Sequence, residues 1–153
     1  MKIAEFLRED LTLPQLAASE KGAALAELCG ALARAYPSLD AAKLTETLLE
    51  REKLGSTGSG EGVAIPHGKL AGVPGLLAAF GRSVGGVDFQ SIDGKPTQLI
   101  FVLFAPENSA GIHLKALARI SRLFRNPSFR KSILDAPSAK AIFQLISEED
   151  ARY

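Results

Sequence analysis

The sequence contains a single cysteine, a single methionine and no tryptophan, and its charges nearly cancel. With Cys29 alone, an internal disulfide and a cysteine-based zinc site are excluded, which suits a reducing compartment. Eighteen basic residues against seventeen acidic ones give a net charge of +1. Nothing in this balance calls for nucleic acid or an anionic membrane as a partner.

Long apolar segments are absent as well. The N-terminus carries Glu5, Arg8 and Asp10 where a secretory signal peptide would be apolar. The longest unbroken apolar run, Leu99 to Ala105, is too short to span a bilayer. We therefore expect a cytoplasmic protein without direct membrane insertion. Its length and its hydrophobic content of 46% fit a single domain over residues 1–153.

Apolar spacing and capping signals predict helices on both sides of a group of strands. The predicted helices are Lys21–Tyr36, Asp40–Leu54, Ala110–Phe124, 127–134 and 138–147. The predicted strands are Leu76–Val84, Val87–Ile92 and Thr97–Phe104, with Asp93-Gly94 as a two-residue hairpin turn. Without a regular strand-helix-strand rhythm, this order favours an α/β sandwich built on a mixed sheet.

The stretch from Gly55 to Lys69 is the most unusual part of the chain. It holds glycines at 55, 58, 60, 62 and 68, which permit positive φ and leave backbone N–H groups accessible to an anion or a partner. Pro66 fixes its own φ and favours an extended Ile65. We therefore expect His67 at the mouth of a strand with one side of its ring open, as a nucleophile would be displayed.

Neither common phosphate-binding motif fits this stretch. A P-loop would need glycine at Val63 and a hydroxyl residue at Leu70, and the dinucleotide fingerprint would also need glycine at Val63. Nucleotide binding therefore has no support. The sequence's two histidines, without neighbouring cysteines or paired carboxylates, also make a poor metal set, so no metal is expected.

His113 and Arg51 are the next candidates, each with an ordinary alternative. His113 falls in the first turn of a predicted helix, on the face that turns inward, where the helix dipole favours a neutral ring and anions are attracted. From the residues alone, a histidine satisfied by nearby backbone is the more common outcome. Arg51 would more often be a solvated helix charge, and Ser56 and Thr57 would often bond only their own loop.

Several motifs together resemble one protein family. They are Glu-Arg-Glu-Lys at 50–53, Gly-Ser-Thr-Gly at 55–58, Ala-Ile-Pro-His-Gly-Lys-Leu at 64–70, Val-Asp-Phe at 87–89 and His-Leu at 113–114. The combination is similar to the IIA domain of the phosphoenolpyruvate-dependent phosphotransferase system, in its mannitol/fructose class and most closely its nitrogen-regulatory branch. The likeness covers roughly the whole chain, although the first 45 residues match only in helical pattern.

The resemblance implies both a fold and a site. The fold would be an α/β sandwich with a mixed sheet of about five strands flanked by helices. His67 would accept a phosphoryl group, while His113 and Arg51 would stabilise its oxygens. Ser56, Thr57 and the backbone at Gly58 would be supporting donors. No cofactor and no magnesium would be needed, because there is no nucleotide to clamp.

The partners implied are a small phosphocarrier protein as phosphoryl donor, docking over an apolar collar around His67, and unidentified regulatory targets. The first hypothesis is that the phosphorylation state of His67 switches the protein's affinity for those targets. The lack of a fused IIB or IIC segment favours this hypothesis. A sugar-specific IIA that passes phosphate to a IIB partner is the second hypothesis. A non-catalytic binding module of the same fold is the third.

Overall fold

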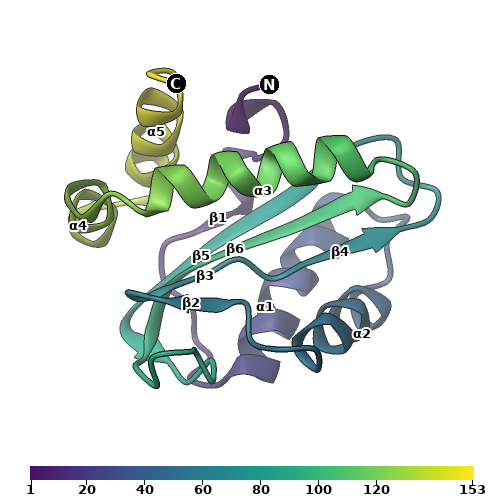
Figure 1. The fold of residues 1–153 in the computed structure, drawn as a ribbon, viewed down its shortest axis with the longest axis horizontal. Coiled ribbons are helices and arrows are strands. Elements are labelled where there is room, and N and C mark those ends of the chain that lie inside the picture. The colour runs from purple at the N-terminus through teal and green to yellow at the C-terminus, as the bar shows by residue number, and fades with distance from the viewer.

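A mixed six-stranded sheet with helices on both faces carries the fold in the computed structural model, which describes residues 1–153 (Figure 1). The sheet has the order β1-β5-β6-β3-β2, and β4 pairs with β6 alongside this path. The strands are β1 (Thr12–Leu13), β2 (Gly58–Gly60), β3 (Val63–Ala64), β4 (His67–Leu70), β5 (Leu77–Val87) and β6 (Thr97–Pro106). The α/β sandwich on a mixed sheet is thereby confirmed, with six strands where about five were expected.

The five predicted helices are all present. They are α1 (Lys21–Ala35), α2 (Ala41–Glu52), α3 (Ala110–Phe124), α4 (Pro127–Asp135) and α5 (Ala139–Asp150), preceded by the 3-10 turns η1 (Ile3–Glu5) and η2 (Glu9–Leu11). Capping side chains fix four of the starts, among them that of α1, where the carboxylate of Glu20 accepts from the N–H of Ala23. Asp40, Asn126 and Ser138 each accept hydrogen bonds from backbone N–H groups in the first turn of α2, α4 and α5 respectively.

Strand β6 lies between two hydrophobic cores, and its side chains alternate between them. Leu99, Phe101 and Leu103 face the core shared with α3, α4 and α5. Ile100, Val102 and Phe104 face the core shared with α1 and α2. Because both faces are covered, β6 is apolar at nearly every position, as expected for a buried central strand.

The predicted strand Val87–Ile92 and its two-residue hairpin are wrong. Strand β5 runs on to Val87, and residues 88–96 form a long connection to β6. The backbone of Asp88 is hydrogen-bonded to residues Ser19 and Lys21, just before and at the start of α1, and not to a sheet neighbour. Val87 and Phe89 are both buried. Only Val87 pairs with a neighbouring strand, opposite Thr97 of β6, so the alternation beyond Val87 reports burial without strand pairing.

Candidate functional site

His67 is the first residue of β4, a strand that pairs in parallel with β6. The N–H of Leu103 donates to the carbonyl of Pro66 at 3.0 Å, which ties the residue before the histidine to the sheet. On the other side, a Cβ on Gly68 would lie 2.7 Å from Cγ2 of Thr47 in α2. The absence of a side chain at Gly68 therefore lets α2 pack directly on the strand that carries His67.

The imidazole of His67 is held in one orientation by its own chain. Nδ1 lies 2.7 Å from the carbonyl oxygen of Ile65. Since a carbonyl oxygen can only accept, Nδ1 must carry the proton, and the lone pair of the neutral ring is then on Nε2. Burial lowers the pKa of His67, the Ile65 contact opposes that change, and the charge of Arg51 adds to the lowering. The ring is thus set up as a neutral imidazole with Nε2 available.

His113 reaches the same place from the other side, out of the first turn of α3. Its ring lies edge-on to that of His67, with centroids 5.5 Å apart and planes inclined by 77°. The residue is 7% exposed, and its Nε2 is buried without a hydrogen-bond partner. Burial lowers its pKa, and the neighbouring His67 and Lys69 add to that effect. A buried nitrogen with no partner is costly unless a ligand satisfies it.

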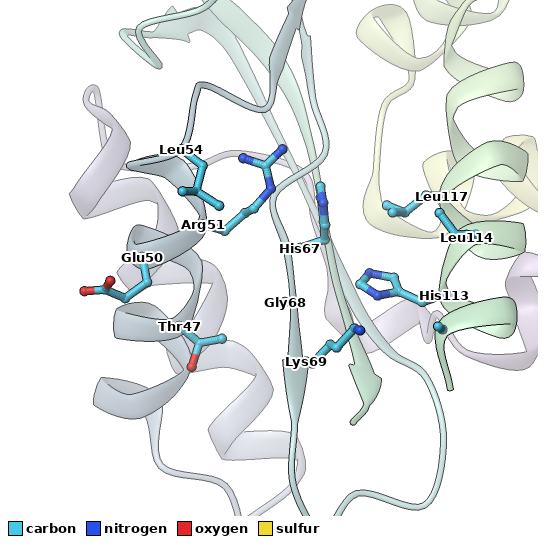
Figure 2. A pocket seen from close by; sticks show the side chains of 11 residues that line it. Thr47, Glu50, Arg51, Leu54, His67, Gly68, Lys69, His113, Leu114 and Leu117 are labelled. Carbon is cyan, nitrogen blue, oxygen red and sulfur yellow. The ribbon is translucent and has the colours of Figure 1, made fainter. Parts of the chain in front are cut away.

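Arg51 belongs to the last turn of α2, and its Nη1 donates to the carbonyl of Gly55 at 2.9 Å. Figure 2 shows its guanidinium on one side of His67 and the ring of His113 on the other. The structure therefore brings the three principal candidates, His67, His113 and Arg51, to the walls of one open cavity of about 710 Å³.

The same cavity contains residues that the sequence interpretation did not assign. Lys69 lines it two positions after His67 in the same strand (Figure 2). That spacing places both side chains on one side of a strand, so the signal was present in the sequence. Around the mouth, Leu54 and Leu114 are 85% and 68% exposed, and Leu117 is half-buried. The opening therefore combines cationic groups with an exposed apolar border.

Ser56, Thr57 and Gly58 do not line this cavity. The hydroxyl of Ser56 donates to the carbonyl of Phe89 and accepts from the N–H of Gly58. The hydroxyl and the N–H of Thr57 both donate to the carboxylate of Glu52. These groups are occupied within the protein, so they hold the loop after Arg51 and do not point donors at the ring of His67.

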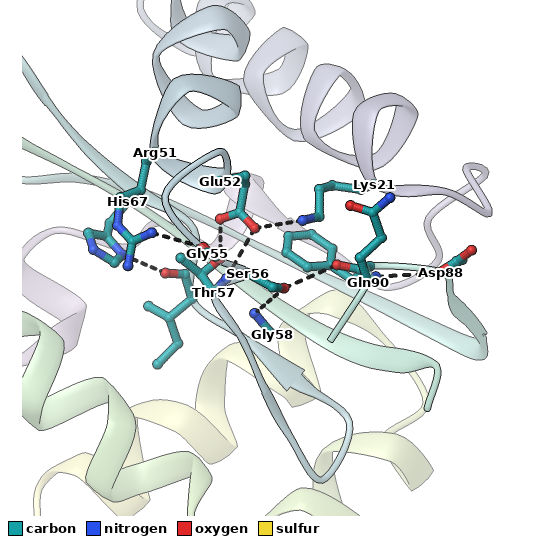
Figure 3. A network of polar contacts seen from close by, with 12 residues as sticks. Lys21, Arg51, Glu52, Gly55, Ser56, Thr57, Gly58, His67, Asp88 and Gln90 are labelled. Carbon is teal, nitrogen blue, oxygen red and sulfur yellow. Dashed lines mark hydrogen bonds and ion pairs between the residues drawn. The ribbon is translucent and has the colours of Figure 1, made fainter. Parts of the chain in front are cut away.

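Glu52 is the buried centre of this loop network (Figure 3). Besides Thr57, it pairs with Lys21 of α1, whose Nζ lies 2.9 Å from Oε1. The Lys21 ammonium also sits over the ring of Phe89, 4.9 Å from its centroid. The network joins α1, the end of α2 and the glycine-rich loop. It depends on residues far apart in the chain, so sequence spacing alone could not reveal it.

Two further features of the chain bear on the expectations from the sequence. Histidine, cysteine, aspartate and glutamate side chains nowhere gather in a group of three or more able to hold a metal ion. No helix combines the length and the apolar character needed to cross a membrane.

Residues 5–149 match the family model described as "Phosphoenolpyruvate-dependent sugar phosphotransferase system, EIIA 2". Among curated proteins, a nitrogen regulatory protein of Bradyrhizobium diazoefficiens is 41% identical over 96% of this chain and 95% of its own length. The fructose-specific EIIABC component of Bacillus subtilis is 40% identical over 98% of this chain, which spans only 24% of that longer protein.

Among solved structures, the nitrogen regulatory protein IIA-Ntr from Neisseria meningitidis superposes with a TM-score of 0.88 at 40% identity. The match covers 94% of this chain and 98% of that one. Fold and sequence thus agree over nearly the entire length of two separate relatives.

Proposed function

Because the chain belongs to the EIIA type-2 family of the phosphoenolpyruvate-dependent sugar phosphotransferase system, we propose that it carries a phosphoryl group on Nε2 of His67. The observation that carries this proposal is the contact between Nδ1 of His67 and the carbonyl of Ile65 at 2.7 Å. It leaves Nε2 as the basic nitrogen of a neutral ring. That nitrogen belongs to a ring that lines an open cavity with cations on its walls.

The transfer step is a displacement at phosphorus. The lone pair on Nε2 of His67 forms a bond to the phosphorus of a phosphohistidine on the donor. The phosphorus–nitrogen bond of the donor breaks, and its electron pair returns to the donor imidazole, whose other nitrogen carries a proton, so that this ring leaves neutral. His67 keeps the proton on Nδ1, which is hydrogen-bonded to the carbonyl of Ile65. No base is needed to activate Nε2. Because the nucleophile is already neutral, the protein's remaining task is to position the groups and neutralise charge.

Arg51, His113 and Lys69 are the groups proposed to meet that charge. In the loose transition state of phosphoryl transfer, negative charge is spread over the three equatorial oxygens. Arg51 supplies guanidinium N–H donors from α2, and Nε2 of His113, which has no partner in the protein, supplies a hydrogen bond from α3. Lys69 adds an exposed cation at the rim. Ser56, Thr57 and Gly58 support the site indirectly. Their polar groups are bonded within the protein, and these bonds hold the loop that follows Arg51.

The proposed donor is a small phosphohistidine carrier protein in the cytoplasm. Its docking surface on this chain would be the apolar border formed by Leu54, Leu114 and Leu117 around the cavity. Exposed leucines at the rim of a polar site are typical of transient protein contacts, in which an apolar ring excludes water while the reacting groups meet.

We favour regulation of target proteins, according to the phosphorylation state of His67, over sugar transport. The support is the match to a nitrogen regulatory protein along 95% of that protein's own length. The second candidate is a fructose- or mannitol-type IIA component that passes its phosphoryl group to a IIB partner. It is supported by 40% identity to part of a fructose-specific component.

The test is the intact mass of the protein after incubation with phosphoenolpyruvate, enzyme I and a phosphocarrier protein, beside the His67→Ala variant. One acid-labile phosphoryl group on the wild type and none on the variant is the expected result. Addition of a purified fructose IIB protein then separates the two candidates, because only a sugar-transport component should lose its label rapidly to it. If an active donor leaves the wild type unlabelled, the chain is a binding module of this fold.

A further inference from the structure

A second cavity, of about 680 Å³, lies along α3 on a different side of the helix from the His67 site. Its walls bring together one apolar group and one basic group of side chains. They are Met1, Ile112 and Ala118, with Lys115, Arg119, Arg122 and Arg125. We call this surface the basic groove. Figure 1 shows both ends of the chain lying above α3, and Met1 at the N-terminus lines the groove.

The cations of the basic groove have no carboxylate among the residues that line it. Arg119 is already committed, because its Nε donates to the buried carboxylate of Asp150. Lys115, Arg122 and Arg125 are exposed and form no salt bridge. In a protein with a net charge of only +1, three cations without an ion pair, two on α3 and one just past its end, form a local field of one sign.

Exposed apolar side chains border the same cations. Met1 is 44% exposed and Ile112 is 50% exposed. Tyr153 is 46% exposed, and the guanidinium of Arg122 lies over its ring at 4.8 Å from the centroid. This stacking places the guanidinium of Arg122, which lines the groove, against an aromatic ring. The surface therefore offers charge and apolar contact together, which is the composition of a protein-binding site.

We propose that the basic groove binds an acidic segment of a partner protein in which carboxylates alternate with apolar side chains. Charge complementarity selects an acidic partner, and Met1, Ile112 and Tyr153 select one that also has apolar groups to bury. An anionic membrane would meet the same charges, but a lipid surface is flat and this site is concave. A narrow peptide segment fits the groove better.

The position of the groove makes such binding independent of the phosphoryl site. Leu114 and Leu117 of α3 line the His67 cavity, whereas Ile112, Lys115 and Arg122 line the basic groove, and the two cavities share no residue. One helix therefore serves two separate surfaces. A partner seated on the groove leaves His67 open to its phosphoryl donor, and this inference goes beyond the proposed carrier function.

The experiment is a titration of isotope-labelled protein with a short peptide in which glutamates alternate with leucines. Binding is measured from the changes in amide chemical shifts. Shifts are expected along residues 112–125 and at Tyr153. The variant Lys115→Glu/Arg122→Glu should bind the peptide about tenfold more weakly, which corresponds to roughly 1.4 kcal/mol. Arg119 is left intact, so the buried pair with Asp150 is preserved.

The matched control is Lys43→Glu/Lys140→Glu, which changes the net charge equally at two exposed lysines outside the groove. Its affinity should equal that of the wild type, and both variants should still accept one phosphoryl group at His67. If peptide binding were weakened equally in both variants, overall charge and not the basic groove would explain it, and the proposal would be overturned. Binding to phosphatidylglycerol vesicles without binding to the peptide would assign the groove to lipid and overturn the proposal, as would shifts confined to the His67 cavity.

Discussion

The ring of His113 stands edge-on to that of His67, with 5.5 Å between centroids, and the buried Nε2 of His113 has no hydrogen-bond partner. Two histidines at this distance disfavour protonation of each other. An anion between them would reverse that preference, because it would accept from both. The pair is therefore most stable in two forms, with both rings neutral or with a negatively charged group between them.

The first prediction concerns the pKa values of the two histidines. Burial lowers both pKa values below the ordinary value of about 6.5. Both rings should thus stay neutral at pH 7 and protonate only under more acidic conditions, as followed by the C2–H chemical shifts in an NMR titration. Since the unfolded chain would bind protons first, the free energy of unfolding should fall as the pH drops below about 6.5.

A second prediction follows for the phosphorylated protein. A phosphoryl dianion on His67 favours the charged form of a neighbouring imidazole, so the pKa of His113 should rise above its value in the free protein. The same NMR titration, repeated on the phosphorylated protein above pH 7 to avoid hydrolysis, measures this change. An unchanged pKa of His113 would mean that its ring does not contact the phosphoryl group.

His113→Ala should slow phosphorylation of His67 by roughly tenfold to a hundredfold, since it removes one donor to the developing charge. Acceptance itself should survive, because the nucleophile and Arg51 remain. Rapid-quench measurement of the rate with a fixed concentration of donor tests this, with His113→Gln as the matched variant that keeps a hydrogen-bond donor. Complete loss of labelling in a folded His113→Ala protein would contradict a supporting role.

Gly68→Ala should destabilise the protein by about 1–3 kcal/mol, because the added methyl group would lie 2.7 Å from Cγ2 of Thr47. Urea unfolding measures the loss. Thr47→Ala removes the opposing methyl group, so the double variant should recover part of the stability that Gly68→Ala loses. If the effects of the two substitutions simply add, the contact between α2 and β4 is not the reason for glycine at this position.

Glu52→Gln should cost about 3 kcal/mol of stability, since it leaves the Lys21 ammonium without its buried partner. The variant Glu52→Gln/Lys21→Met, which removes both charges, should be more stable than Glu52→Gln alone. Thermal unfolding of the single and double variants compares them. A single variant as stable as the wild type would show that the ion pair contributes nothing to folding.

Much of the fold could be predicted because its signals are local. The helix starts at Asp40, Asn126 and Ser138 are set by side chains that bond the first turn of their own helix. Strand β6 is apolar because both its faces are covered. The failure at 87–92 has the opposite cause, since the backbone of Asp88 finds its partners at Ser19 and Lys21, a pairing that no short window contains.

The candidate site divides in the same way. Pro66 and Gly68 flank His67 in the sequence and shape its surroundings directly, so its display at the start of a strand could be predicted. Arg51 and His113 approach His67 from opposite sides because α2 and α3 lie on either side of β4, which only the resemblance to a family could suggest. The Glu52–Lys21 pair left no such signal, and the hydroxyls of the glycine-rich loop were expected nearer the ring than they are.

Strand β4 pairs with β6 on one side only. An unpaired strand edge is a template on which a second copy of a protein can add its own strand and begin to aggregate. Here the strand is four residues long, follows a proline and displays the ammonium of Lys69. These features discourage such growth, so the residues that expose His67 to a partner also help to keep crowded copies of the protein apart.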